Sequence, residues 1–278
     1  MEIVNKAIDY IWNSENKYKI GAWWALWLVA SIAIMFPIGF VYGFLSSIFM
    51  MDGNKTMYVV SYIVFVLVIP IFQALVQSVP LGNYLRNFDS VLNSNESIIL
   101  EFPFDNFKEK FVKGIKFYVV FFYYSLPLQI ITTSIGIFQV VNQVNNINNE
   151  VLNLILTVIS WGSIVLYSLL MKFFLKPAIT HVAAQNGFRK ALSIKKIIEE
   201  VKLNFPDMMR VGLILFLFSM VFGIGLMISA FSILLCIGVF LFPIMLVVLQ
   251  IVNIYVEPFL MAQIFIDNNT KENQVELK

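Results

Sequence analysis

Long runs of apolar residues dominate this chain and alternate with short polar connections. Six runs are long enough to cross a membrane, because about 20 residues of α-helix span a hydrocarbon core of about 30 Å. They lie near residues 20–49, 57–79, 115–141, 151–175, 208–231 and 239–264. The pattern therefore predicts an all-α membrane protein with six transmembrane helices.

Shorter amphipathic stretches precede the first, third and fifth of these runs. Their apolar residues recur at i, i+3/i+4 and i+7, which places them on one face of a helix. The three faces comprise Ile3, Val4, Ala7, Ile8, Ile11 and Trp12; Phe104, Phe107, Phe111, Val112 and Ile115; and Ile194, Ile197, Ile198, Val201 and Phe205. Beside a membrane span, such a helix is expected to lie in the cytoplasmic interface.

The same order of elements recurs three times along the chain. Each unit has an amphipathic helix, two spans joined by a short outer turn, and a proline nine residues before an Asp or Asn. These pairs are Pro80 and Asp89, Pro177 and Asn186, and Pro258 and Asp267. We therefore expect one polytopic domain over 1–278, built as three helical hairpins with pseudo-threefold character, from units 1–89, 98–186 and 190–267. The alternative is that any six-span protein shows connections of this kind without a repeat.

The outer turns of these three hairpins are short. The first is expected at residues 51–56 and the second at residues 142–150. The third is less obvious, because residues 208–266 are continuously apolar, and it is expected near Cys236. Three hairpins with short outer turns would leave the longer polar connections on the opposite side of the membrane.

Composition supports the membrane assignment. Hydrophobic residues make up 59% of the chain and charged residues 13%, about half the charged fraction of a soluble domain. Mean hydropathy is +0.82. A soluble protein could not bury so much apolar surface, so the excess is expected to face the lipid bilayer. The first span begins with Trp23, Trp24 and Trp27, which are predicted to anchor it in the interface.

Basic residues lie almost entirely on one side of the predicted membrane. Of the 19 Lys and Arg, only Lys55 falls in an outer connection. Because basic residues favour the cytoplasmic side, both termini are expected in the cytoplasm of a bacterial or archaeal cell, with the chain in its cell membrane. The expected partners are anionic lipid headgroups at the cytoplasmic face, and a protein partner or a second copy. The net charge of +2 gives no reason to expect nucleic acid.

Few residues could carry catalytic chemistry. The chain has one histidine, His181, and one cysteine, Cys236, so HExxH zinc sites and cysteine metal clusters are excluded. It contains neither a P-loop nor a G-x-S-x-G sequence. The acidic pair Glu199 and Glu200 fits the solvated face of an amphipathic helix. We predict no catalytic residue, no cofactor and no metal, and expect that the chain is not an enzyme.

Charged residues inside predicted spans are the first candidate site, because placing one in lipid costs about 2.5–3.5 kcal/mol or more. Lys172, Lys176 and Glu257 qualify. Lys176 and Glu257 directly precede Pro177 and Pro258, so they occupy equivalent positions in two units. We expect these two residues to pair across the bundle. The alternative is that the lysines reach the headgroups and Glu257 contacts a hydroxyl or water.

Uncharged polar residues extend this candidate site. Gln250, Asn253 and Glu257 are spaced i, i+3 and i+7, so they form one stripe on the last span. Gln73 and Gln77 are spaced i and i+4 on the second span. One interpretation is a polar pathway through the bundle. The other, which we favour from the sequence, is hydrogen bonding between helices, worth about 0.6–2 kcal/mol per contact.

Two stretches of the chain match a known pattern. The first contains Gly82-Asn83-Tyr84-Leu85-Arg86-Asn87, the acidic Glu96 and Glu101, Pro103-Phe104-Asp105-Asn106-Phe107, and Phe111-Val112-Lys113-Gly114-Ile115-Lys116. The second contains Phe188-Arg189-Lys190-Ala191-Leu192, Ile197-Ile198 and Asn204-Phe205-Pro206. Over residues 60–266 the chain resembles the membrane proteins grouped as domain of unknown function 4013 (DUF4013). It departs from them mildly, with Asn83 between Gly82 and Tyr84 and Phe104 where Trp is frequent. The resemblance implies a helical membrane protein and assigns no activity.

Three functions fit these features. The favoured one is a non-enzymatic membrane subunit, scaffold or accessory factor of a transport, secretion, immunity or envelope system. The second is a small-molecule or ion permeation protein that uses the polar stripe of Gln250, Asn253 and Glu257. An intramembrane enzyme acting on lipid is the least favoured, because the motifs are missing. A water-filled cavity along the stripe would favour permeation, and a closed, dry bundle would favour a subunit.

Overall fold

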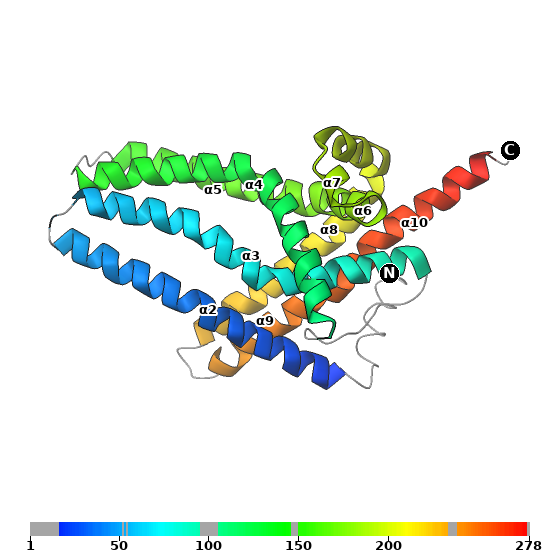
Figure 1. Cartoon of the computed structure of the whole chain (residues 1–278), viewed down its shortest axis with the longest axis horizontal. Coiled ribbons are helices and arrows are strands. Elements are labelled where there is room, and N and C mark those ends of the chain that lie inside the picture. Colours follow the sequence, from blue (N-terminus) through cyan, green and yellow to red (C-terminus); the bar gives the residue numbers. More distant parts are fainter. Residues whose placement is uncertain are drawn as a thin grey trace. The chain divides into compact units, whose positions relative to one another are not determined.

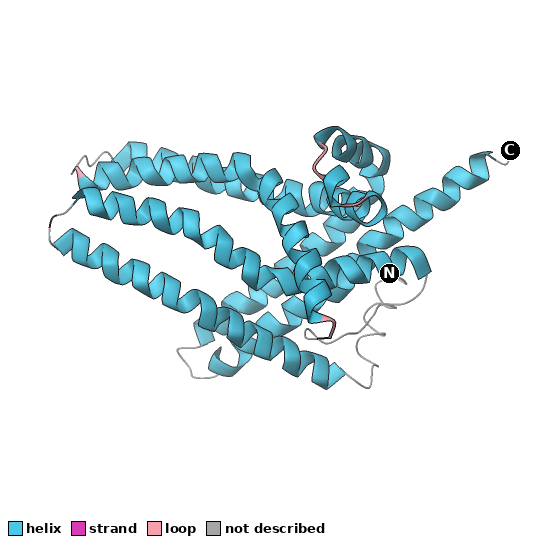
Figure 2. Ribbon diagram, viewed as in Figure 1, coloured by secondary structure: helices cyan, strands magenta, loops and turns pink. Residues whose placement is uncertain are grey.

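The computed structural model describes residues 17–51, 53, 55–94, 105–145, 150–232 and 238–276 of the chain. These residues form helices joined by turns and contain no strand (Figure 2). The α-helices are α2 (Lys17–Met51), α3 (Lys55–Ser94), α4 (Phe107–Val144), α5 (Glu150–Leu170), α6 (Lys176–Asn186), α7 (Phe188–Ala191), α8 (Ile194–Ser232), α9 (Gly238–Ile251) and α10 (Glu257–Glu276) (Figure 1). Two π-helical segments, η1 (Met171–Leu175) and η3 (Val252–Val256), interrupt this series.

Six helical stretches of the described residues are long and apolar enough to cross a membrane. They are Ile20–Phe49, Thr56–Asn93, Phe107–Asn142, Glu150–Asn186, Ile194–Gly225 and Leu241–Ile266. The all-α class and the number of apolar helices predicted from the sequence are therefore confirmed. Helix α3 continues beyond the expected end of the second span near residue 79, as far as Ser94. Buried packing of Tyr84, Phe88 and Val91 stabilises this extension beyond Pro80.

The amphipathic stretches that the structure describes are continuous with the spans that follow them. Residues 107–115 form the first turns of α4, and residues 194–205 form the first turns of α8. No separate helix precedes either span in these ranges, so an interfacial orientation stays a prediction. The first amphipathic stretch, Phe104 and the third outer turn near Cys236 lie outside the described residues.

Contacts divide the chain into two compact units. Unit 1 comprises Met1–Val29, Gln77–Val120 and Lys172–Lys278, and unit 2 comprises Ala30–Val76 and Phe121–Met171. Unit 2 is built from segments of α2, α3, α4 and α5. Large apolar side chains such as Phe40, Leu67 and Leu166 are exposed on it. Such exposure is expected for helices that face lipid rather than water.

Unit 1 contains most of the buried side chains. Within it α8 packs against α6 and α9, and α10 packs against α6 and α8. The largest buried apolar side chains of this core are aromatic: Trp24, Tyr84, Phe88, Phe117, Tyr255 and Phe265. Edge-to-face contacts join several of these rings, including Phe88 with Phe265.

The sequence suggested that Trp24 anchors the first span in the interface. In the structure, Trp24 is instead part of this core. Its side chain is fully buried, and its Nε1 donates a hydrogen bond of 3.0 Å to the hydroxyl of Tyr255. The two rings also pack edge to face. Trp23, in contrast, is exposed. The cluster of tryptophans therefore divides between core and surface, because adjacent residues lie on different faces of a helix.

Two glycines allow α3 and α4 to cross with their backbones in contact. A Cβ atom built on Gly82 would lie 2.0 Å from the carbonyl oxygen of Lys110. A Cβ atom on Gly114 would lie 1.6 Å from the carbonyl oxygen of Ser78. Both distances are far inside van der Waals contact, so only glycine fits at these positions. Both glycines belong to the first DUF4013-like stretch, and their packing explains why that stretch carries them.

Candidate functional site

The two π-helical segments occupy equivalent places in the chain. Segment η1 ends directly before Lys176 and Pro177, and η3 ends directly before Glu257 and Pro258. A π turn contains one more residue than an α turn, so it changes the direction of the side chains that follow, and π turns are frequent at functional sites. The first predicted unit lacks this feature, since α3 is α-helical through Pro80. The second and third units therefore share a local geometry that is absent from the first.

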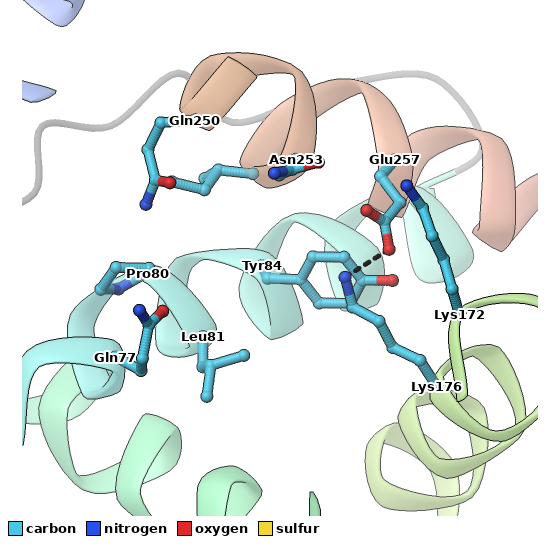
Figure 3. Close-up of a pocket in the computed structure, with 10 residues that line it drawn as sticks. Gln77, Pro80, Leu81, Tyr84, Lys172, Lys176, Gln250, Asn253 and Glu257 are labelled. Carbon is cyan, nitrogen blue, oxygen red and sulfur yellow. Dashed lines mark hydrogen bonds and ion pairs between the residues drawn. The ribbon is translucent and has the colours of Figure 1, made fainter. Parts of the chain in front are cut away.

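Lys176 and Glu257 form an ion pair (Figure 3). The Glu257 side chain is 2% exposed and the Lys176 side chain 20% exposed, so water screens the pair weakly. The ammonium of Lys176 also lies 4.1 Å from the centre of the Tyr84 ring, in cation–π geometry. The structure thus brings together the two residues that precede Pro177 and Pro258. Lys176 neutralises the buried carboxylate instead of extending to the surface.

Lys172 lies one turn before Lys176 and is half-buried. Its ammonium donates a hydrogen bond to Oγ of Ser219 on α8. The Ser219 hydroxyl in turn donates to the carbonyl oxygen of Leu215, at 2.7 Å, so its oxygen is free to accept from Lys172. Among the described residues Lys172 has no ion-pair partner. It is nevertheless close enough to interact electrostatically with Lys176 and Glu257.

These charged residues line an open pocket of about 300 Å³ in unit 1. Its polar lining comes from Gln77, Tyr84, Lys172, Lys176, Gln250, Asn253 and Glu257 (Figure 3). Pro80, Leu81 and Ile254 supply the apolar lining. Helix α3, the η1–α6 stretch and the α9–η3–α10 stretch therefore each form one side of it. The volume lies at the lower end of the range for small-molecule sites, about 300–1,000 Å³.

The pocket gathers most of the polar residues that the sequence singled out. The exception is Gln73, which belongs to unit 2 and does not line it. Within the part of the chain that the structure describes, Gln77, Gln250 and Asn253 form no hydrogen bond with another protein group. This differs from the expectation that these amides join the helices to one another. Their polar groups are therefore available to water or a ligand.

Sequence reasoning missed Tyr84 and Ser219 as members of this site. Tyr84 is fully buried beneath Lys176, and its hydroxyl lies near Thr180 and Glu257 without reaching hydrogen-bond geometry with either. A signal for Tyr84 existed, because it lies in the DUF4013-like stretch that begins at Gly82. Ser219 gave no signal, since a serine in a transmembrane helix usually bonds to its own helix.

Asn87 ties α3 to the π turn that orients Glu257. Its Nδ2 donates a buried hydrogen bond of 2.9 Å to the carbonyl oxygen of Ile254. The π turn disturbs the regular hydrogen bonding of the helix backbone, and a side-chain donor satisfies one of its carbonyl groups. Asn87 therefore holds one side of the pocket against another.

Replacing Asn87 with leucine should lower the stability of the protein. The change keeps the volume but leaves a buried carbonyl oxygen without its donor, which costs about 1–3 kcal/mol. Thermal unfolding in mild detergent measures the loss. Asn93→Leu on the same helix is the matched control, because Asn93 is exposed and donates a hydrogen bond to the nearby Asp89 side chain. Equal unfolding temperatures for the two variants would contradict the role assigned to Asn87.

A second buried cluster surrounds His181 and corrects the placement of Glu200. The His181 ring stacks on Phe265 with a centroid distance of 3.9 Å, and its Nδ1 lies 2.9 Å from Oε1 of Glu200. Glu200 also accepts a hydrogen bond from Asn204. It therefore lies in a contact between α6 and α8 and not on a solvated face, whereas Glu199 is exposed as expected. Helical phase explains the difference, because adjacent residues point about 100° apart.

The six apolar helices and the all-helical fold support a multi-pass integral membrane protein. The chain belongs to the family described as "Protein of unknown function (DUF4013)", whose model matches residues 63–237. No curated protein and no solved structure matches the chain. The family match includes Tyr84, Lys172 and Lys176 but ends before the polar residues of α9, η3 and α10.

Proposed function

We propose that this chain is a non-enzymatic protein of the cell membrane that binds a small polar solute in the pocket around Lys176 and Glu257, as a step of permeation. The observation that carries the proposal is the open polar pocket along Gln250, Asn253 and Glu257. Polar groups within a membrane protein are costly unless they contact each other, water or a ligand. The side-chain amides of Gln77, Gln250 and Asn253 have no protein hydrogen-bond partner among the described residues. They can therefore bind a solute or water.

The charge distribution supports a cytoplasmic opening for this pocket. With both termini in the cytoplasm, the second, fourth and sixth spans run from the outside to the cytoplasm. The pocket residues Gln77, Lys176 and Glu257 lie in the C-terminal halves of these three spans. Such an opening would give a cytoplasmic solute direct access to the site.

Labelling of single cysteines tests this proposal. In a chain whose native Cys236 is replaced by serine, Gln250→Cys should react with a charged, membrane-impermeant thiol reagent added from the cytoplasmic side. Val248→Cys on the same helix is the control, because Val248 is apolar, exposed at the helix surface and outside the pocket. Its thiol would face lipid, where the reactive thiolate is disfavoured. We expect Gln250→Cys to react faster by roughly tenfold or more.

The result separates the two main readings of the site. Reaction of Gln250→Cys from the cytoplasmic side supports a solute pocket with the orientation given above. Reaction only from the outer side would reverse the orientation. If Gln250→Cys is as unreactive as Val248→Cys, the pocket is dry and the permeation proposal is wrong.

A membrane subunit or accessory factor is the second candidate, and one surface favours it. The first turns of α8 expose the apolar side chains of Ile194, Ile198 and Phe205 beside Lys195 and Lys202. An apolar stripe flanked by lysines suits docking at an anionic lipid surface or on a partner protein. A dry pocket in the labelling experiment would leave this candidate as the better supported one.

A further inference from the structure

We infer that the pocket selects an anion, a small carboxylate- or phosphate-bearing group that binds at Lys172. This inference rests on the proposed function, since it names the class of solute that the same pocket takes. It follows from the charges that line the pocket, from the donors that remain unused, and from the way Ser219 holds the lysine.

The charges around the pocket do not cancel. Two lysines and one glutamate line it, so its formal charge is +1. Glu257 is neutralised by the ion pair with Lys176, which leaves Lys172 as the surplus cation. A half-buried ammonium without a carboxylate partner is costly inside a membrane protein. An anion bound beside Lys172 would supply the missing charge.

The groups available near Lys172 include several hydrogen-bond donors. The Lys172 ammonium has three N–H groups and gives one to Ser219, so two remain. Ser219 is fixed by its own bond to Leu215, and it therefore holds the lysine in place. The buried hydroxyl of Tyr84 is a further donor in the lining of the pocket. Carboxylate and phosphate oxygens accept several such bonds at once, and these bonds are strong because they are charge-assisted.

Two sources can present this chemistry. A free solute would enter from the aqueous side, and an anionic lipid would place its headgroup phosphate in the pocket. Basic pockets between transmembrane helices on the cytoplasmic side bind lipid headgroups in this way. The site chemistry is the same in both cases, so an experiment must supply each source separately.

Protection of Gln250→Cys from thiol labelling tests the inference. Inorganic phosphate or acetate is added to the full chain, first in a neutral detergent and then in phosphatidylcholine nanodiscs. Sodium chloride at equal ionic strength controls for screening. A separate arm uses nanodiscs that contain phosphatidylglycerol. Labelling should slow about tenfold when the anion is present at about ten times its Kd, because about nine-tenths of the sites are then occupied.

Substitutions of Lys172 locate the site. Lys172→Gln should abolish protection, Lys172→Arg should retain it, and Lys190→Gln should leave it unchanged, since Lys190 is exposed and outside the pocket. Protection by soluble phosphate or acetate identifies a free solute, and protection only in phosphatidylglycerol identifies a headgroup. Protection by choline chloride beyond that by sodium chloride, or full protection of Lys172→Gln, would overturn the inference. Rapid labelling that no anion slows would also overturn the inference. That result would not contradict the proposed solute pocket.

Discussion

Replacing Gly114 with alanine is expected to force α3 and α4 apart and to destabilise the protein strongly. The new Cβ would lie 1.6 Å from the carbonyl oxygen of Ser78, which is backbone and cannot move as a side chain can. Overpacking of this kind costs about 1–3 kcal/mol, and more where backbone must shift. Gly82→Ala should behave similarly, since its Cβ would meet the backbone of Lys110 at 2.0 Å. The unfolding temperature in mild detergent measures both effects.

Gly162→Ala is the matched control for this prediction. Gly162 also lies inside a transmembrane helix, but nothing lies within 4 Å of the Cβ that alanine would add. Alanine is favoured over glycine within a helix by about 0.5–1 kcal/mol, so this variant should be slightly more stable than the native protein. The opposite signs separate packing from helix propensity. If Gly114→Ala and Gly162→Ala unfold at the same temperature, the two backbones are not in contact.

Removing one member of the Lys176–Glu257 pair should have the second large effect. Lys176→Met leaves a carboxylate that is 2% exposed without its cation, and Glu257→Met leaves two neighbouring lysines without their anion. Breaking a buried ion pair on one side costs about 3–5 kcal/mol. The double variant Lys176→Met/Glu257→Met should lose much less, because it leaves no unpaired charge. A double-mutant cycle of unfolding free energies measures this coupling.

The ion pair of Glu109 and Lys113 provides the comparison within the same protein. Its oxygen and nitrogen are 2.8 Å apart, but both side chains are largely exposed on the surface of α4. Exposed pairs contribute only about 0.2–1 kcal/mol because water screens them. Its double-mutant cycle should therefore show little coupling. A coupling for Lys176 and Glu257 as small as that for the exposed pair would mean that water enters the site and screens the charges.

Together these variants separate two requirements of the pocket. The glycine contacts hold α3 against α4, and α3 carries Gln77 and Tyr84 into the site. The ion pair joins α6 to α10 across the site. Loss of the first should displace one side of the pocket, whereas loss of the second should change its charge. Labelling of Gln250→Cys in each background distinguishes these outcomes, because the residue itself is unchanged.

Much of the architecture could be read from local patterns. Each apolar run is long enough to form a membrane-spanning helix by itself, so the six helices needed no knowledge of their neighbours. The placement of Lys176 and Glu257 before equivalent prolines was likewise visible along the chain. Their encounter was an expectation from the cost of unpaired charge in lipid, and the structure contains that pair. The proposed three hairpins and their internal repeat stay predictions.

The remaining features depend on contacts between residues that are far apart in sequence. Trp24 looked like an interfacial anchor because it lies at the start of the first span, yet its partner Tyr255 lies 231 residues away. Glu200 looked solvated within its own helix, but His181 faces it from α6. A local pattern specifies which residues share a helix face and does not specify what that face meets.

Local patterns along the chain therefore define the membrane class, the six apolar helices and the residues whose charge or polarity required a partner. These properties follow from hydrophobic length and from the cost of polar groups in lipid, and both act within a single helix. The pocket, in contrast, depends on contacts between helices. Its shape requires the glycine contacts of α3 and α4, the two π turns and the hydrogen bond from Lys172 to Ser219. The glycine contacts and the Lys172–Ser219 hydrogen bond join separate helices, so no single stretch of sequence contains the pocket.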